Sequence, residues 1–98
     1  MKPHEFHPEA RLEYIEAAMH YANASPGLGD RFYDEIFRLI AEIRHSPSRF
    51  RHFDGPWQRH FSTTFPYTVI YVQEPERIYI IAVMHMHRKP GYWKYRVA

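Results

Sequence analysis

The sequence predicts an α+β fold, in which an N-terminal α-helical hairpin packs on a twisted, mainly antiparallel sheet of three to four strands. Two segments in the first half repeat apolar residues at spacings of three and four, as amphipathic helices do. A Pro- and Gly-rich stretch, residues 25–29, separates them. In the second half, residues 65–84 hold two runs of β-branched and aromatic residues around a short polar break, which is the pattern of a β-hairpin. The chain of 98 residues suits one such domain, residues 1–98.

The two helices are expected to form a hairpin. The first should begin at Pro8, because proline fits the first turn of a helix, and end at Ser25. Its apolar stripe, which should face the core, consists of Leu12, Ile15, Met19 and Ala22. The second helix should stop at Pro47 and bury the stripe formed by Phe32, Ile36, Leu39, Ile40 and Ile43. The joint apolar face of this hairpin requires a cover.

The sheet should supply that cover. A strong hairpin joins residues 65–72 to 78–84 through a turn at 74–77, and a weaker strand, residues 57–63, precedes it. With this turn, Tyr71 pairs with Ile80 and Tyr67 with Met84, whereas an odd loop length would reverse the faces. Both faces of the hairpin are largely apolar. We therefore expect it to be central in the sheet, covered either on both sides or on one side with a groove on the other.

Composition excludes several classes of protein. The chain has no cysteine, which excludes a disulfide framework and a thiol nucleophile and fits a reducing cytosol. The N-terminus lacks the apolar core of a signal peptide, and no apolar run approaches the roughly 18 residues that span a membrane, so we expect a cytoplasmic protein with no membrane partner. The net charge is only +2, but cations gather in residues 44–59 and 85–96. These segments suit RNA or an acidic protein segment, or else form an ordinary solvated surface.

The C-terminal third contains the candidate functional residues. If the chain cleaves RNA, His85 and His87 would transfer protons and Arg59 would hold the phosphate, with help from Arg88. For contact with a target or with nucleic acid, the candidates are the cations and aromatic rings of the tail: Arg88, Lys89, Tyr92, Tyr95 and Arg96. Trp93 should be packed, whereas Tyr95, Arg88 and Arg96 should be exposed. The alternative is that His85 is a hydrogen-bonded core histidine and Arg88 a plain surface cation.

No metal site and no cofactor are expected. His85 and His87 would lie on one face of a strand, and His60 could approach them. However, no Asp, Glu or Cys stands close in the sequence to complete a set of ligands. A Gly-rich phosphate loop is also absent, since Gly27 and Gly29 lie in the connection between the helices.

Three motifs in the second half carry a family resemblance. They are FPY-x-V-I-Y from Phe65, the H-x-H-R that ends the last strand, and P-x-Y-W-x-x-R from Pro90. In this order and spacing, together with the helix start at Phe6–Ala10, they resemble RelE/ParE toxins of bacterial type II toxin–antitoxin systems, which serve in plasmid stabilisation. The resemblance implies a short first strand at Lys2–His7 and a growth-inhibiting toxin neutralised by a cognate antitoxin. It also allows a homodimer or a toxin–antitoxin hetero-oligomer.

The family has two functional branches. RelE-type members cleave mRNA on the ribosome, whereas ParE-like members poison DNA gyrase without catalytic chemistry of their own. Arg59 and Arg88 match basic positions of the ribonucleases, but Thr68 stands where they usually carry a second arginine. The P-x-Y-W-x-x-R ending looks more like the ParE branch. We therefore expect a ParE-like toxin with gyrase as its possible target, with an mRNA endoribonuclease, or a non-toxic RNA- or protein-binding module, as the alternatives.

Overall fold

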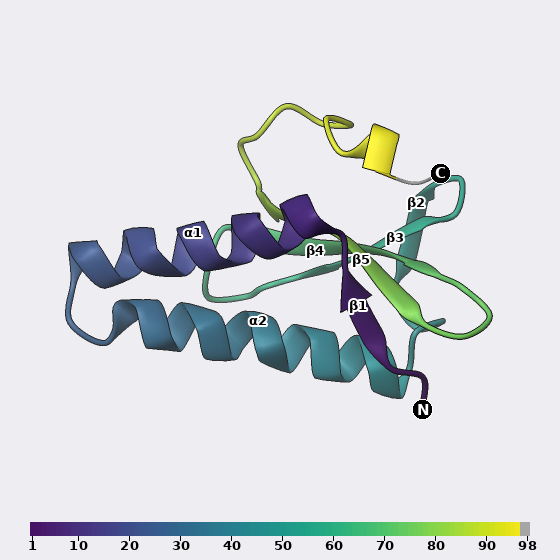
Figure 1. Ribbon diagram of the computed structural model, residues 1–98, viewed down its shortest axis with the longest axis horizontal. Coiled ribbons are helices and arrows are strands. Elements are labelled where there is room, and N and C mark those ends of the chain that lie inside the picture. The colour runs from purple at the N-terminus through teal and green to yellow at the C-terminus, as the bar shows by residue number, and fades with distance from the viewer. Residues whose placement is uncertain (97–98) are drawn as a thin grey trace.

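The computed structural model describes residues 1–96 and shows two helices beside a five-stranded sheet (Figure 1). Along the chain follow β1 (His4–Phe6), α1 (Pro8–Ala24), α2 (Leu28–His45), β2 (Arg51–Asp54), β3 (Trp57–Phe61), β4 (Tyr67–Gln73), β5 (Ile78–His85) and the 3₁₀ turn η1 (Lys94–Arg96). The order in the sheet is β1-β5-β4-β3-β2. Along residues 1–96, neither helix is long and apolar enough to cross a membrane.

The α+β class and the helical hairpin are confirmed, but the number of strands is higher than predicted. The sheet is mixed, because β1 runs parallel to β5 while the other pairs are antiparallel. The first strand, which only the resemblance implied, is therefore present. The strand β2 was missed because it has four residues, three of them exposed, and so shows little of the apolar pattern that marks a strand.

The helices meet closely at Gly29. A Cβ atom added to this residue would lie 2.6 Å from the carbonyl oxygen of Ala18 and 2.7 Å from the Cβ of Ala22, so only glycine allows this approach. The helix α1 begins at Pro8 as predicted, and the His7 Nδ1 accepts a hydrogen bond of 3.0 Å from the Glu9 N–H, which caps its first turn.

The predicted core stripe of α1 is wrong. Leu12 and Met19 are 55% and 59% exposed, and Ile15 is exposed as well. The buried side of α1 instead carries Ala10, Tyr14 and Ala17. Both sets have helical spacing, so periodicity alone does not choose between them. The buried side consists of small residues and a tyrosine because the helix lies close against α2 and the sheet, where alanine leaves enough room. The tyrosine can be buried there because the Tyr14 hydroxyl donates a hydrogen bond of 2.6 Å to the Tyr33 carbonyl oxygen.

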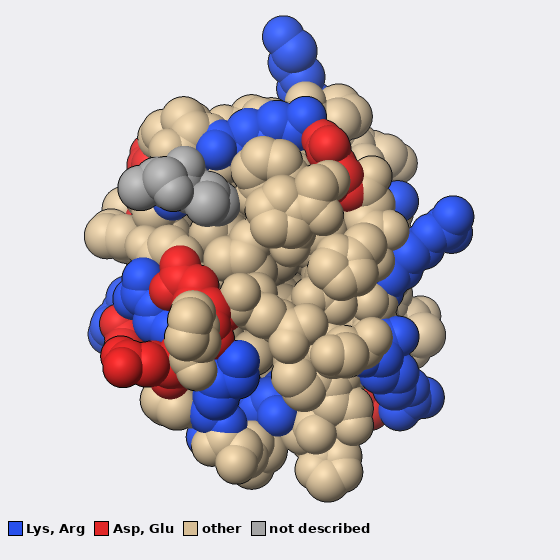
Figure 2. All heavy atoms as spheres, turned by 90° about the vertical axis from the view of Figure 1, so that its right-hand side faces the viewer, with Lys and Arg blue, Asp and Glu red and all other residues tan. Residues whose placement is uncertain are grey.

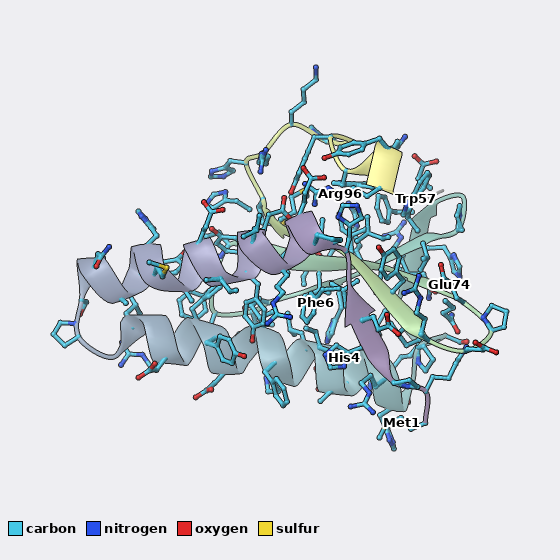
Figure 3. The ribbon with its side chains drawn as sticks, in the orientation of Figure 1. Met1, His4, Phe6, Trp57, Glu74 and Arg96 are labelled. Carbon is cyan, nitrogen blue, oxygen red and sulfur yellow. The ribbon has the colours of Figure 1, made fainter. Side chains whose placement is uncertain are left out.

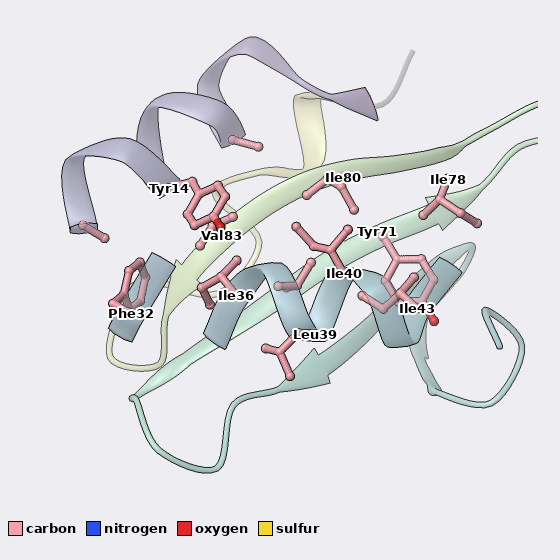
Figure 4. Close-up of a cluster of buried hydrophobic side chains, with 13 residues drawn as sticks. Tyr14, Phe32, Ile36, Leu39, Ile40, Ile43, Tyr71, Ile78, Ile80 and Val83 are labelled. Atoms are coloured by element: carbon pink, nitrogen blue, oxygen red, sulfur yellow. The ribbon is translucent and has the colours of Figure 1, made fainter. Parts of the chain in front are cut away.

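Apolar side chains cover both faces of the sheet. The predicted stripe of α2 is confirmed and lies, with Tyr14, Tyr71 and Ile80, in a core between helices and sheet (Figure 4). On the opposite face, a second core joins strand residues to Trp93 of the tail; it consists of Ile70, Val72, Ile81, Ala82, Met84 and Trp93. The hairpin is therefore covered on both sides, which decides between the two alternatives, and Trp93 is packed as expected.

A β-bulge changes the predicted register of the hairpin. Near the turn, Tyr71 pairs with Ile80 as predicted. Ile81, however, has no pairing partner in β4. Farther from the turn, from Ile70 back to Tyr67, the pairing is shifted by one residue, so that Tyr67 faces His85 rather than Met84. Because neighbouring residues of a strand point to opposite faces, this extra residue turns Val83 and His85 toward the helices.

Candidate functional site at the end of β5

A cleft of about 330 Å³ opens between α1 and the end of β5. The helix contributes one wall, the strands β4 and β5 another, and the segment after β5 closes one end. The residues that line it are Glu13, Glu16, Ala17, His20, Tyr67, Val83, His85 and Arg88. Carboxylates, imidazoles, a phenol and a guanidinium thus meet in one place, and these are the groups that proteins use for proton transfer and for binding anions.

His85 lies in this cleft because the bulge directs it there. Its ring packs edge-on against Tyr67, with the ring centroids 5.1 Å apart. Its Nδ1 accepts a hydrogen bond of 3.1 Å from the His87 N–H. The neutral ring therefore carries its proton on Nε2, from which it can donate. The His87 ring is close, with its centroid 5.1 Å from that of His85, but it is exposed to solvent.

Glu13 connects α1, β5 and the tail. Its carboxylate accepts hydrogen bonds from the Val83 N–H at 3.1 Å, from the Tyr92 hydroxyl at 2.6 Å and from both terminal nitrogens of Arg96. The Arg88 Nη1 lies 3.5 Å away. Burial, together with the hydrogen bond and charge of Glu13, raises the pKa of Tyr92. The phenol therefore stays protonated near neutral pH and acts as a donor to Glu13 rather than as a base.

Arg96 is not an exposed cation, which corrects the expectation for this residue. It is only 7% exposed and lies between the tail and α1 (Figure 3). Its Nη1 donates both to Glu13 and to the Ile81 carbonyl oxygen, the latter at 3.1 Å. Burial acts to lower the pKa of Arg96, but the hydrogen bonds and charge of Glu13 outweigh it, and the pKa is raised. Arg96 is thus a charged structural contact between the tail and α1.

The other tail candidates are more accessible. Arg88 and Lys89 are exposed, and the Arg88 guanidinium lies over the Tyr92 ring, 4.0 Å from its centroid. Tyr95 is exposed as expected, and its hydroxyl contacts a carboxylate oxygen of Glu9. We call these four residues, Arg88, Lys89, Tyr92 and Tyr95, the tail surface.

Arg59 lies on the other face of the sheet. It pairs with Ile70, whose side chain belongs to the core beneath the tail, and its guanidinium lies over the Phe53 and Phe61 rings at 4.4 and 4.9 Å. His85 faces the helices. The three residues proposed for RNA cleavage are therefore not brought together: His85 and His87 are neighbours, and Arg59 is separated from them by the sheet.

Two further observations concern the second phosphate-binding cation and the metal site that were considered from the sequence. Thr68, at the position where the ribonucleases usually carry arginine, is fully buried and donates a hydrogen bond of 3.1 Å to the His60 carbonyl oxygen. His60 itself bonds Glu42 at 2.8 Å and stacks on Phe50, on the helix side of the sheet. In the described part of the chain, no three His, Asp or Glu side chains are grouped so that they could hold a metal ion.

Comparison with known proteins decides the family. Residues 5–90 match the family model described as the ParE toxin of the type II toxin–antitoxin system parDE. The chain belongs to this family. A solved structure titled "Chromosomal ParDE TA system from P. aeruginosa" is similar to this ParE-family toxin with a TM-score of 0.77 at 10% identity, over 89% of this chain and 98% of that chain. At that identity the likeness shows the fold alone. No curated protein matches the toxin in sequence.

Sequence reasoning missed the central role of Glu13 in this ParE-family toxin. Glu13 lies off the apolar stripe expected for the first helix, where a carboxylate is ordinarily solvated. One signal was available: Glu9 and Glu13 lie one turn apart, next to Ala10 and Tyr14, which also have helical spacing. Nothing in the sequence indicates that Arg96, 83 residues later, reaches this carboxylate.

Proposed function

We propose that the protein inhibits growth by binding DNA gyrase rather than by cutting mRNA. One observation carries this choice: Arg59 and His85 point to opposite faces of the sheet. Cleavage of a phosphodiester requires the phosphate-binding cation and the proton-transfer groups around the same atoms, within a few ångströms. The loss of a second cation at Thr68 supports the same conclusion, because that position is buried and neutral.

The tail surface is the proposed contact with the target. Binding to gyrase needs a shaped basic and aromatic surface, not a set of acids and bases. Arg88 and Lys89 supply exposed positive charge, and Tyr92 holds the Arg88 guanidinium by stacking. Positive charge steers a protein toward DNA or toward an acidic protein surface. Arg96, by contrast, supports this surface from beneath through Glu13.

An antitoxin is the proposed partner that keeps the toxin silent in the cytoplasm. The basic segment 44–59 offers exposed cations for it. Arg49 and Arg51 are exposed and form no ion pair with any described residue. On the face that Figure 2 presents, basic side chains lie along the top, right and bottom, acidic ones lie at the left and upper right, and an uncharged area lies between them. An acidic segment that folds along this surface would combine charge neutralisation with apolar burial, which offsets the entropy lost on ordering.

Ribosome-dependent mRNA cleavage is the second candidate, and the cleft favours it. His85 and Arg88 line the same hollow. As an imidazolium, His85 could give its Nε2 proton to the leaving oxygen, and Arg88 could hold the phosphate. In this reading Arg59 plays no part in the reaction.

Two assays of the chain made by cell-free synthesis separate these functions. The first measures supercoiling by purified gyrase, and the second maps cuts in ribosome-bound mRNA by primer extension. We expect inhibition of supercoiling that is about tenfold weaker in Arg88→Ala and unchanged in Arg31→Ala, a change at an exposed cation on α2 far from the tail in sequence. Prompt mRNA cleavage that disappears in His85→Ala, with gyrase unaffected, would reverse the proposal.

A further inference from the structure

Two arginines face each other at the edge of the sheet that lies farthest from β1 (Figure 1). Arg51 of β2 pairs directly with Arg59 of β3, so both side chains project from the same face of the sheet. Arg59 in turn pairs with Ile70, which belongs to the core beneath the tail, so this face is the one opposite the helices. We call it the outer face. Like charges directly opposite each other in a sheet are destabilising, so folding alone does not account for this pair.

No carboxylate compensates the two arginines. Within residues 1–96 neither of them forms an ion pair, and the Arg59 Nε is buried without a hydrogen-bond partner. Asp54 is the only acidic residue of β2 and β3, and its Oδ2 lies 2.5 Å from the Lys94 Nζ. The positive charges of Arg51 and Arg59 are therefore available for an anion.

Aromatic rings fix Arg59 and extend the charged surface. The guanidinium carbon of Arg59 lies 4.4 Å from the centroid of the Phe53 ring and 4.9 Å from that of the Phe61 ring. These contacts restrict the orientation of the guanidinium. Phe61 is the last residue of β3 and is 38% exposed. The outer face therefore offers a partly exposed ring beside a positive charge that is held in place.

We propose that this part of the outer face, formed by Arg51, Arg59 and Phe61, binds a single strand of DNA. The planar guanidinium groups fit the oxygens of the backbone phosphates, and a neighbouring base stacks on the Phe61 ring. The bases of a duplex are stacked on one another, so a duplex uses only the charge. An acidic peptide would meet the charge through its carboxylates, but these groups do not use the exposed ring.

The choice of DNA rests on the proposed function, whereas the binding of a strand does not. Trp93 packs against Phe53 and Trp57 on the outer face, and its neighbour Tyr92 belongs to the tail surface. The strand-binding surface is thus continuous with the proposed contact for gyrase, an enzyme that acts on DNA. Holding the enzyme and a strand at the same time would strengthen both contacts. Arg51 also lies in the basic segment proposed for the antitoxin, so a bound antitoxin would cover this site.

Fluorescence anisotropy of a labelled oligothymidylate of about twelve nucleotides tests the site on the intact chain, made by cell-free synthesis. We expect a dissociation constant of about 10 μM near physiological salt, within the range of sequence-independent binding. Arg51→Ala should weaken binding about tenfold, and Phe61→Ala about fivefold. The matched controls are Arg11→Ala and Phe37→Ala, which remove an exposed cation and an exposed ring from the helices. Both should bind as the wild type does.

Two further readouts distinguish a phosphate contact from a loss of folding. In Arg51→Ala, the slope of log affinity against log salt concentration should be less steep by about 0.7, the value for one phosphate contact with a single strand. The same variant should melt at or above the temperature of the wild type, because it removes the facing like charges. A lower melting temperature together with an unchanged slope would overturn the phosphate-binding role of Arg51.

Other outcomes overturn the proposal as a whole. They are the absence of binding by the wild type, tighter binding of a duplex than of the single strand, and tighter binding of a polyglutamate peptide. An RNA oligomer of the same length that binds more than about tenfold tighter would assign the surface to the mRNA function instead. The supercoiling assay stays independent. Strand binding without inhibition of gyrase would overturn the proposed function alone, and inhibition without strand binding would overturn this inference alone.

Discussion

Arg96, in the 3₁₀ turn η1, forms a two-pronged ion pair with Glu13 on the first helix. The Nη1 lies 3.0 Å from Oε1, and the Nη2 lies 3.1 Å from Oε2. The same two side chains also satisfy the free edge of β5 beyond the end of β1. Glu13 accepts from the Val83 N–H, and Arg96 donates to the Ile81 carbonyl oxygen. The pair thus occupies a stretch of the edge where no strand pairs with β5, and it fixes the tail at the same time.

Loss of the Arg96 side chain should therefore destabilise the protein. We expect Arg96→Ala to lower the free energy of unfolding by about 3 kcal/mol, because it leaves the Glu13 carboxylate largely buried without its strongest partner. Urea unfolding at pH 7 measures this. Arg96→Lys should lose less, since it keeps the charge but only one donor direction. In a double-mutant cycle with Glu13→Gln, the combined loss should be smaller than the sum of the two single losses. Additive losses would mean that the pair is not coupled.

Arg88 should behave in the opposite way. Its side chain is about half exposed, and its distance from Glu13 is 3.5 Å, so Arg88→Ala should change the free energy of unfolding by less than about 0.5 kcal/mol. If the tail surface contacts the target, inhibition of gyrase should weaken by about tenfold, as for the loss of one arginine at an interface. Thermal melting and the supercoiling assay give the two readouts. A fully folded Arg88→Ala protein with full activity would remove this residue from the site.

The sequence predicted an element correctly where its apolar pattern was compatible with only one arrangement in the structure. The stripe of α2 and the turn at 74–77 follow from spacing and from β-branched runs, and both are present. The stripe of α1 was misassigned because two sets of residues share helical spacing, and spacing alone does not show which set faces the core. The sequence also placed Trp93 and Tyr95 correctly, one packed and one exposed.

The site was harder to predict than the fold, because it depends on single-residue shifts and distant contacts. Ile81 is one more apolar residue in a strand, yet as a bulge it turns His85 into the cleft. From the sequence alone, Arg96 is expected to be a solvated cation, but it is buried because it pairs with the Glu13 carboxylate, 83 residues away. Neither effect leaves a periodic signal in the sequence.

Trp93 should be the main anchor of the tail. It is 2% exposed and packs edge-on against the rings of Phe53 and Trp57, at centroid distances of 5.5 and 5.2 Å. Trp93→Ala should cost about 3–5 kcal/mol, because it removes a large buried ring from the core beneath the tail. Differential scanning calorimetry checks this. Tyr95→Ala is the matched control, because its ring is exposed and should contribute little. Equal melting temperatures for the two variants would mean that the tail does not stabilise the sheet.

Glu35 should make stability depend on pH in the acid range. Its carboxylate accepts hydrogen bonds from Arg38 at 2.9 and 3.1 Å and from the Ser62 hydroxyl at 2.7 Å; Ser62 in turn accepts from the backbone of the β3–β4 loop. The hydrogen bond from Arg38 is the largest cause that holds the pKa of Glu35 below its ordinary value of 4.5. The folded state therefore binds this proton less readily than the unfolded chain does. The resulting stabilisation is present above about pH 4.5 and is lost as the pH falls through the folded pKa.

Glu35→Gln tests this directly. At pH 7 the variant should be less stable than the wild type by about 1.5 kcal/mol, the lower end of the range for hydrogen bonds to charged groups, since the glutamine side chain can still accept a hydrogen bond. The difference should shrink as the pH falls below the ordinary pKa of a carboxyl group, because the wild-type side chain then also becomes neutral. Urea unfolding at pH 7, pH 5 and pH 3.5 measures the trend. Glu76→Gln, at an exposed carboxylate in the β4–β5 turn, should show no such trend. A Glu35→Gln deficit that stays constant across this range would mean that the lost contact is steric rather than ionic.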